Sequence, residues 1–361
     1  CHFGWDWGPC VPYKYLGNVE IQCFDKKIEN IAVNQKIEGD TAFVSVFADG
    51  ADKIALFAPN GDEIKGNDGE FEIQNPELWY TRDLNEKNEQ PLYTVELSNG
   101  EETVTKKIGL RTVELNREKD EYGENFQLVV NGKRIFAKGA NLIPFAAIPD
   151  LADEKTVDYY IDLAVKSNFN IIRVWGGATY ANEYLMAKCD EKGILIWQDF
   201  AMGCTFYPQR SSFTRNIEEE VISVVCKLRN HPSVALWSGN NEDDIALRWS
   251  LLPFNLDPNR DVVTRQVIPS VLYEFDPTRP YLPSSPYISE AVYQKGCDEK
   301  YWPENHLWGP RGYYKDPFYI DAQCAFVSEI GYHGCPNLES LKKMMTEDCV
   351  YPWVKDHEWN D

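Results

Sequence analysis

Two glutamates stand in polar motifs where paired carboxyl groups could do chemistry. Glu242 ends the run Gly239-Asn240-Asn241-Glu242, and Glu329 lies in Ser328-Glu329-Ile330-Gly331. Each follows a short apolar run typical of a buried strand. Two carboxyl groups about 5–5.5 Å apart can cleave a glycosidic bond with retention, one attacking the anomeric carbon and one protonating the leaving oxygen. The pattern predicts Glu242 and Glu329 as such a pair, and Asn241 as a contact for the sugar 2-hydroxyl.

The two glutamates and the polar residues near them can also be interpreted without a catalytic role. A single glutamate at a strand end is more often a solvated or helix-capping carboxylate, and only the pair, each in its own motif, favours catalysis. Asp243 and Asp244 follow Glu242 and are predicted to form a solvated loop, while Asp199 is predicted to orient its neighbours at the pocket wall. The five histidines show no metal-ligand spacing, so neither a metal nor a cofactor is expected.

Residues 13–115 show the sequence pattern of an antiparallel β domain. About seven short runs rich in β-branched and aromatic residues alternate with turn signals such as Asn60-Gly61 and Asn99-Gly100. This pattern predicts an immunoglobulin-like β-sandwich. Asn131-Gly132 then joins two further runs and predicts a hairpin with a type I′ turn.

Residues 116–361 alternate between compact apolar strands and amphipathic helices. Val157, Tyr160, Ile161 and Ala164 are predicted to share one buried helical face, and a second helix is expected behind Asn216 as its N-cap. About seven strands can be counted from Lys138 onward. This alternation predicts a (β/α)8 TIM barrel with chemistry at the carboxyl ends of its strands, truncated before strand eight. A doubly wound fold is disfavoured because no glycine fingerprint follows a strand.

The amino-acid composition limits the kinds of ligand and partner that the protein is expected to bind. The net charge of −21 disfavours nucleic acid, whose phosphates would be repelled, and no apolar run is long enough to predict a membrane span. Eleven Trp and twenty Tyr suit a carbohydrate ligand, because aromatic faces stack on sugar rings. The absence of an Asn-x-Ser/Thr sequon favours a cytoplasmic protein, with lysosomal or secreted locations left open. Cys1 and Cys10 bracket a short loop and could pair.

Seven stretches, in order, resemble the β-mannosidases of glycoside hydrolase family 2. They are Phe3-Gly4-Trp5-Asp6-Trp7-Gly8-Pro9, Lys138-Gly139-Ala140-Asn141, Arg173-Val174-Trp175-Gly176-Gly177, Trp197-Gln198-Asp199-Phe200, Asn230-His231-Pro232-Ser233, Leu236-Trp237-Ser238-Gly239-Asn240-Asn241-Glu242 and Phe326-Val327-Ser328-Glu329-Ile330-Gly331.

The resemblance implies a retaining exo-β-mannosidase acting on terminal non-reducing β-mannose of oligosaccharides, with Glu242 as acid/base and Glu329 as nucleophile. It also implies that the chain is a central fragment, in which residues 1–12 are the remnant of a jelly-roll domain. Such a fragment could itself be inactive. Open alternatives are another family 2 specificity (β-galactosidase, β-glucuronidase or exo-β-glucosaminidase) or a non-catalytic carbohydrate-binding fragment. The sequence leaves the oligomeric state open.

Further site residues follow from the resemblance alone. Trp5 and Asp6 would reach the glycone pocket, and Arg173 would support the nucleophile. The remaining pocket walls would be tryptophans, namely Trp175, Trp249 and Trp308.

Overall fold

A computed structural model describes residues 20–85, 90–120, 123–146, 152–177, 179–249, 256–310, 315–331, 336–346 and 349–350. The chain divides into two compact units, Cys1–His306 with Cys324–Ser328, and Leu307–Gln323 with Glu329–Asp361, and each is described by itself. Within the described ranges, no helix has both the length and the apolar character needed to cross a bilayer.

Two four-stranded antiparallel sheets begin the larger unit. One has the order β1-β2-β6-β5 and the other β4-β3-β7-β8. Along β2, Ala42 and Val44 are buried while Phe43 between them faces outward, which is the alternation of a sheet with one covered face. The sandwich-like arrangement predicted for this region is therefore confirmed. The strands are β1 (Glu29–Glu38), β2 (Thr41–Asp49), β3 (Lys53–Phe57), β4 (Glu63–Ile64), β5 (Gly66–Asn67), β6 (Glu70–Gln74), β7 (Tyr93–Ser98) and β8 (Thr103–Ile108).

A three-stranded sheet links this region to the next. Its order is β13-β12-β9, and β12 and β13 form the predicted hairpin. Asn131 and Gly132 both have positive φ, 49° and 71°, as a type I′ turn requires. The bounds are β9 (Val113–Asn116), β12 (Gln127–Val130) and β13 (Lys133–Arg134); a separate small ribbon pairs β10 (Lys119–Asp120) with β11 (Gly123–Glu124).

Five parallel strands in chain order form the centre of the same unit. They are β14 (Gly139–Leu142), β15 (Ile171–Val174), β16 (Leu195–Asp199), β17 (Val234–Ser238) and β18 (Tyr281–Leu282). Strands β15, β16 and β17 are buried along their whole length. On β15, Ile172 belongs to the cluster formed with the helices, whereas Ile171 belongs to the cluster formed with the β9–β12–β13 sheet. Both faces of the sheet are therefore covered, as its near-continuous apolar sequence indicates.

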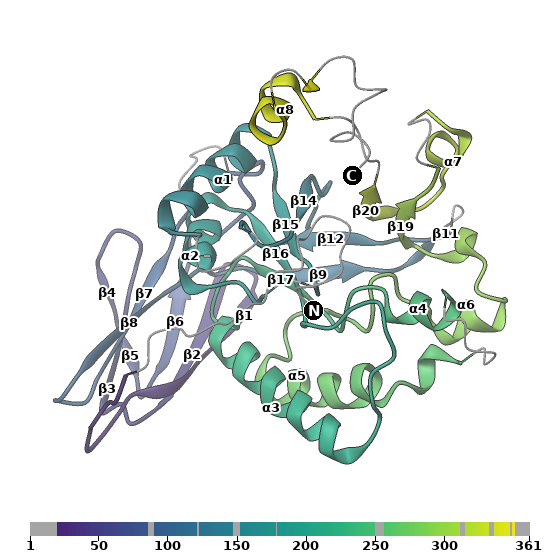
Figure 1. Ribbon diagram of the computed structural model, residues 1–361. Helices are drawn as coiled ribbons and strands as arrows, with labels where there is room; N and C mark the ends of the chain where they lie inside the picture. The colour runs from purple at the N-terminus through teal and green to yellow at the C-terminus, as the bar shows by residue number, and fades with distance from the viewer. Residues whose placement is uncertain are drawn as a thin grey trace. The chain divides into compact units, whose positions relative to one another are not determined.

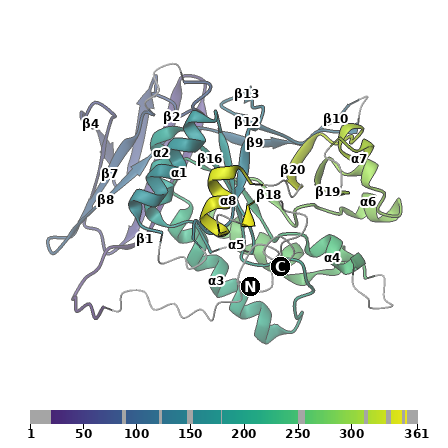
Figure 2. The same ribbon diagram turned by 45° about the horizontal axis from the view of Figure 1, so that its top comes forward.

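Helices cover one face of this parallel sheet. Helix α1 (Glu154–Lys166) lies beside α2 (Glu183–Lys192), and α3 (Ser211–Leu228) lies beside α5 (Ile268–Phe275) (Figures 1 and 2). The predicted buried face of α1 is confirmed at Val157, Ile161 and Ala164, which are buried, but is wrong at Tyr160, which is 44% exposed at the edge of that face. The predicted N-cap of the next helix is wrong: α3 begins at Ser211, so Asn216 lies inside it.

Shorter elements complete the described chain. Strands β19 (Glu304–Trp308) and β20 (Phe326–Gly331) form a separate two-stranded sheet, so a complete eight-stranded barrel is not present among the described residues. The remaining helices are α4 (Asp243–Trp249), η2 (Pro258–Arg260), the π-helix η3 (Val263–Val267), α6 (Glu290–Gln294), η4 (Glu299–Tyr301), α7 (Pro317–Ile320) and α8 (Leu338–Met344).

Two side chains of the sandwich region donate hydrogen bonds to backbone carbonyls in the region of the parallel sheet and its helices. Arg111 donates through Nε to the carbonyl of Pro232 at 2.8 Å and through Nη2 to that of Val234 at 2.6 Å. The indole of Trp79 donates to the carbonyl of Asp190 at 2.8 Å. The two Arg111 bonds satisfy carbonyls at the amino end of β17, and the Trp79 bond satisfies a carbonyl in α2.

Candidate active site

The buried guanidinium of Arg173 connects the carboxyl end of its own strand, β15, with those of β14, β16 and β17. Arg173 on β15 donates through Nη2 to Asp199 Oδ2 at 2.7 Å and to Asn241 Oδ1 at 2.9 Å. Its Nη1 reaches Asn141 Oδ1 on β14 at 3.2 Å. Because Asn241 Oδ1 accepts from Arg173, the Asn241 amide is fixed with Nδ2 directed elsewhere, and Nδ2 lies 3.4 Å from the sulfur of Cys204.

Asp199 is the acceptor that keeps Arg173 in place. Besides Nη2, Arg173 donates through Nε to Asp199 Oδ1 at 3.3 Å, and the carboxylate also accepts from Trp197 Nε1 at 2.9 Å and from the backbone N–H of Gly176 at 3.0 Å. Asp199 is 1% exposed. Four donors on one buried carboxylate make it a positioning group, as the sequence analysis proposed, while its role toward a substrate stays a prediction.

Glu242 lies directly beyond β17 in an uncommon backbone conformation. Its φ is 66°, in the left-handed region that non-glycine residues rarely adopt, and such strain gathers at functional sites. Its N–H donates to the carbonyl of Ser285 at 2.8 Å, and its carbonyl accepts from the N–H of Ala246 at 2.8 Å. These two bonds on opposite sides of the residue hold the strained turn and fix where the carboxyl group points.

The Glu242 carboxyl group is held at both oxygens. The thiol of Cys204 donates to Oε2 at 3.2 Å, and His306 Nδ1 lies 2.7 Å from Oε1. The pKa of the Cys204 thiol is raised, first by burial and then by the neighbouring charge of Glu242. The thiol therefore stays protonated and acts here as a hydrogen-bond donor.

Behind His306 lies a second buried carboxyl group, Glu304 on β19. His306 Nε2 is 3.0 Å from Ser285 Oγ, which in turn donates to Glu304 Oε1 at 2.8 Å. Ser328 Oγ also donates to Glu304 Oε1. Burial raises the pKa of Glu304, although the hydrogen bonds from Ser328 and Ser285 act in the opposite direction. Sequence analysis did not single out Cys204, Ser285 or Glu304.

Glu329 lies on β20 in the smaller unit. Its Oε2 accepts a hydrogen bond from Trp308 Nε1 at 2.9 Å, so Trp308 contacts the predicted nucleophile. Glu242 belongs to the larger unit. The convergence of Glu242 and Glu329 on one bond therefore stays a prediction.

The structure describes some, but not all, of the other residues predicted to bind the sugar. Trp175 follows β15 and is buried, with Gly177 so close that an added Cβ would lie 1.9 Å from the Trp175 ring. Trp249 ends α4, and its side chain lies outside the described residues. The described residues also do not include Trp5 or Asp6, nor Cys1 and Cys10.

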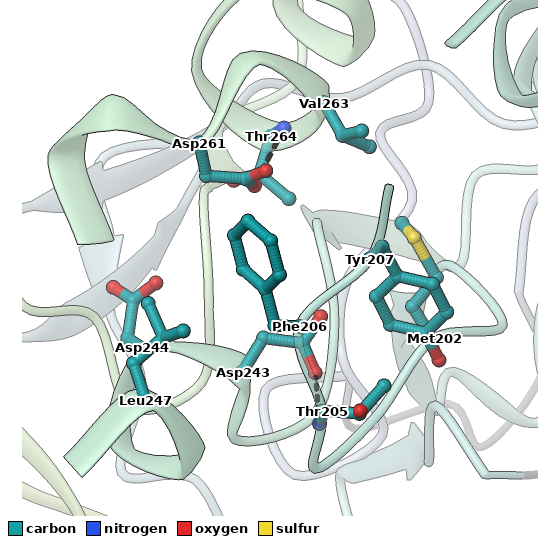
Figure 3. A pocket seen from close by; sticks show the side chains of 10 residues that line it. All are labelled: Met202, Thr205, Phe206, Tyr207, Asp243, Asp244, Leu247, Asp261, Val263 and Thr264. Atoms are coloured by element: carbon teal, nitrogen blue, oxygen red, sulfur yellow. Dashed lines mark hydrogen bonds between the residues drawn. The ribbon is translucent and has the colours of Figure 1, made fainter. Parts of the chain in front are cut away.

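The prediction of a solvated loop at Asp243 and Asp244 is wrong. Both are buried at the start of α4, and Asp244 pairs with both terminal nitrogens of Arg265 at 2.8 and 2.6 Å. Figure 3 shows both aspartates lining a pocket together with Asp261, with Asp243 accepting from the backbone of Thr205. Burial raises the pKa of Asp243 and of Asp244. Arg265 already supplies Asp244 with a positive charge, so these aspartates do not argue for a bound cation.

Comparisons with known proteins identify the class. Residues 17–111 match the family model described as glycosyl hydrolases family 2. Beta-mannosidase B of Aspergillus oryzae is 31% identical over 323 residues, which are 79% of this chain and 38% of the relative. The beta-mannosidase of Bos taurus is 29% identical over 401 residues, covering 96% of this chain and 44% of the relative. The chain belongs to glycoside hydrolase family 2.

The solved structures point in the same direction. The crystal structure of a beta-D-mannosidase from Dictyoglomus thermophilum matches with a TM-score of 0.78 at 27% identity, covering 91% of this chain and 43% of that one. A beta-glucuronidase of Parabacteroides merdae, 18% identical with a TM-score of 0.56, covers 70% of this chain and 33% of that one and shares the fold. The chain thus spans less than half the length of each of these relatives, and those that resemble it in sequence are β-mannosidases.

Proposed function

We propose that the protein containing this chain is a retaining exo-β-mannosidase. Glu329 attacks the anomeric carbon while Glu242 protonates the leaving oxygen, and Glu242 then deprotonates the water that hydrolyses the glycosyl-enzyme. The proposal includes a TIM-barrel framework behind an immunoglobulin-like sandwich, with β14 to β18, β19 and β20 as barrel strands. The observation that carries it is Glu242, a carboxyl group held at both oxygens at the end of β17, in a chain similar to β-mannosidases.

The contacts of Asn241 support a sugar-binding role. Arg173 occupies its Oδ1 and one N–H of Nδ2 faces the Cys204 sulfur, so the second N–H of Nδ2 is left to donate to a sugar hydroxyl. The Asn241 amide stands beside Glu242, where a bond to the 2-hydroxyl would strengthen as the transition state forms. Walls from Trp5, Trp175, Trp249 and Trp308, with Asp6 at the outer hydroxyls, complete the proposed pocket for a β-mannoside oligosaccharide. They suit this neutral ligand better than a nucleic acid or a lipid surface.

The assignment of Glu329 is tested by replacing its carboxylate. In the full-length protein, Glu329→Gln should lower hydrolysis of an aryl β-mannoside by at least about 10³-fold, because an amide cannot form the glycosyl ester. A matched control is Glu299→Gln, the same substitution at an exposed residue of η4. Near-wild-type turnover by Glu329→Gln would refute the assignment. Mass spectrometry of peptides after reaction with a slow 2-fluoro mannoside should find the sugar on Glu329.

The sugar specificity is tested separately. Initial rates on aryl β-mannoside, β-glucoside, β-galactoside, β-glucuronide and β-glucosaminide should be highest for the mannoside. A preference for any other member of the panel would replace mannosidase by that family 2 activity. No turnover of any member would favour a non-catalytic carbohydrate-binding protein.

A further inference from the structure

Three buried groups form a line that ends on the proposed acid/base. Glu304 Oε1 accepts from Ser285 Oγ at 2.8 Å, Ser285 Oγ lies 3.0 Å from His306 Nε2, and His306 Nδ1 lies 2.7 Å from Glu242 Oε1. Ser285 is 0% exposed and Glu304 is 2% exposed, so water does not compete for these bonds. All four residues belong to the larger unit.

The direction of each hydrogen bond along this line follows from the number of protons available. Ser285 has one hydroxyl proton, and that proton goes to Glu304. Ser285 Oγ can then only accept from His306, so Nε2 must carry a proton. A neutral imidazole with its proton on Nε2 has an unprotonated Nδ1, which can accept the proton of Glu242.

Protonation of Glu304 need not reverse this direction. Burial raises the pKa of Glu304, but Oε1 already accepts from two hydroxyl groups, those of Ser285 and Ser328. Within the described part of the chain, Oε2 of Glu304 is buried with no hydrogen-bond partner, so it is the oxygen open to a proton. With the proton on Oε2, Oε1 remains an acceptor and Ser285 still donates to it.

We propose that Glu304 and Ser285 are positioning residues that hold His306 with its proton on Nε2, so that Nδ1 accepts a hydrogen bond from protonated Glu242. This inference rests on the proposed function for the role of Glu242. In the glycosylation step, the proton shared by Glu242 and His306 goes to the leaving oxygen. In the second step, a proton from water returns to Glu242, and the pair regains its starting state with no other reactant.

Other ionisable groups around this line keep their own partners. Cys204 donates to the second oxygen of Glu242, so the thiol competes for neither Oε1 nor His306 Nδ1. The positive charge of Arg173 lowers the pKa of Glu304, but Arg173 is itself bound by Asp199. His306 is thus the described group that can exchange a proton with Glu242 Oε1 over a short hydrogen bond.

The tautomer can be measured without any turnover. Nitrogen-15 NMR of histidine-labelled full-length protein, with His306 assigned from His306→Gln, should show Nε2 protonated and Nδ1 as an acceptor. Ser285→Ala removes the acceptor for Nε2–H, and the proton should move to Nδ1. Ser328→Ala is the matched control, because Ser328 donates to the same Glu304 oxygen without contacting Nε2, and it should leave the tautomer unchanged. A proton on Nδ1 in the wild type, or no change in Ser285→Ala, would overturn the proposal.

Kinetics then separate a catalytic effect from a packing effect. Ser285→Ala should lower kcat/KM, which reports the glycosylation step alone, by roughly 10- to 100-fold on a β-mannoside with an alcohol leaving group; this is a fraction of the 10²–10⁴-fold that acid catalysis supplies. It should change kcat/KM by less than about 2-fold on a dinitrophenyl mannoside, whose leaving group needs no proton. His231→Gln, which alters a different buried histidine–carboxylate pair, should not produce this split. Equal losses on both substrates would overturn the proposal. If the wild type cleaves no β-mannoside, the proposed function fails while the NMR result still decides the tautomer.

Discussion

The substitution Asp199→Asn removes one charge from the most connected carboxylate of the site and keeps its shape. Oδ1 of Asp199 accepts from Arg173 Nε and Trp197 Nε1, and Oδ2 accepts from Arg173 Nη2 and the N–H of Gly176. An asparagine amide has one accepting oxygen. Whichever way it is turned, its NH₂ group faces two donors, and the buried Arg173 loses the negative charge of Asp199.

The cost can be worked from these contacts. Arg173 is 4% exposed and Asp199 is 1% exposed, so solvent cannot replace the lost acceptor. Breaking a buried ion pair by removing one of its partners costs about 3–5 kcal/mol of unfolding free energy. At about 2–4 °C per kcal/mol for large domains, the midpoint of thermal unfolding should fall by roughly 6–20 °C.

The assay is thermal unfolding of full-length wild type and Asp199→Asn followed by circular dichroism. The matched control is Asp298→Asn, which makes the same change in an ion pair with Lys300 where the two side chains are 43% and 63% exposed. This control should leave the midpoint unchanged, because exposed pairs contribute little. An Asp199→Asn midpoint within 1–2 °C of wild type, at about the error of such a measurement, would refute the reasoning that Arg173 depends on this partner.

Two further predictions concern stability. Burial lowers the pKa of His231, but hydrogen bonds to Asp190 and Glu183 outweigh it and raise that pKa to about 9. The folded pKa is above the usual 6.5, so the stabilisation is complete below pH 6.5 and is lost as pH rises through 9. Chemical denaturation should show unfolding free energy falling by about 2–3 kcal/mol over that window in wild type and clearly less in His231→Gln; equal slopes would contradict the pairing. Gly193→Ala should cost about 2–3 kcal/mol, against about 1 kcal/mol for Gly296→Ala, as measured by their unfolding midpoints. Both glycines have positive φ, 67° and 77°, but only at Gly193 would a Cβ meet a backbone atom, at 2.8 Å. Equal costs at the two glycines would show that the close approach does not matter.

Short sequence patterns were sufficient to predict individual helix faces and turns. The spacing of Val157, Ile161 and Ala164 predicts the buried face of α1, and Asn131-Gly132 predicts the hairpin turn. Both depend on neighbours within a few residues, whose geometry the chain fixes by itself. The start of α3 could not be predicted in this way. Arg210 at its N-cap position makes no side-chain capping hydrogen bond, so the sequence carries no capping signal there.

Contacts between residues far apart in the chain could not be predicted from short sequence patterns. Asp244 looked like part of a solvated loop, and its partner Arg265 lies 21 residues further along the chain. Cys204 and His306 reach Glu242 from 38 and 64 residues away. A serine, a cysteine or a glutamate has no sequence signal that states which remote atom its hydrogen bond will meet.

The sequence by itself determined the family, the order of the elements and the two glutamates most suited to glycoside chemistry. The tertiary structure decided which groups surround Glu242. Parallel strands place their carboxyl ends at one edge of a sheet, so residues far apart in the chain meet there. In that buried setting each polar atom needs a partner, and this requirement selects Cys204, His306, Ser285 and Glu304 as the neighbours of the proposed acid/base.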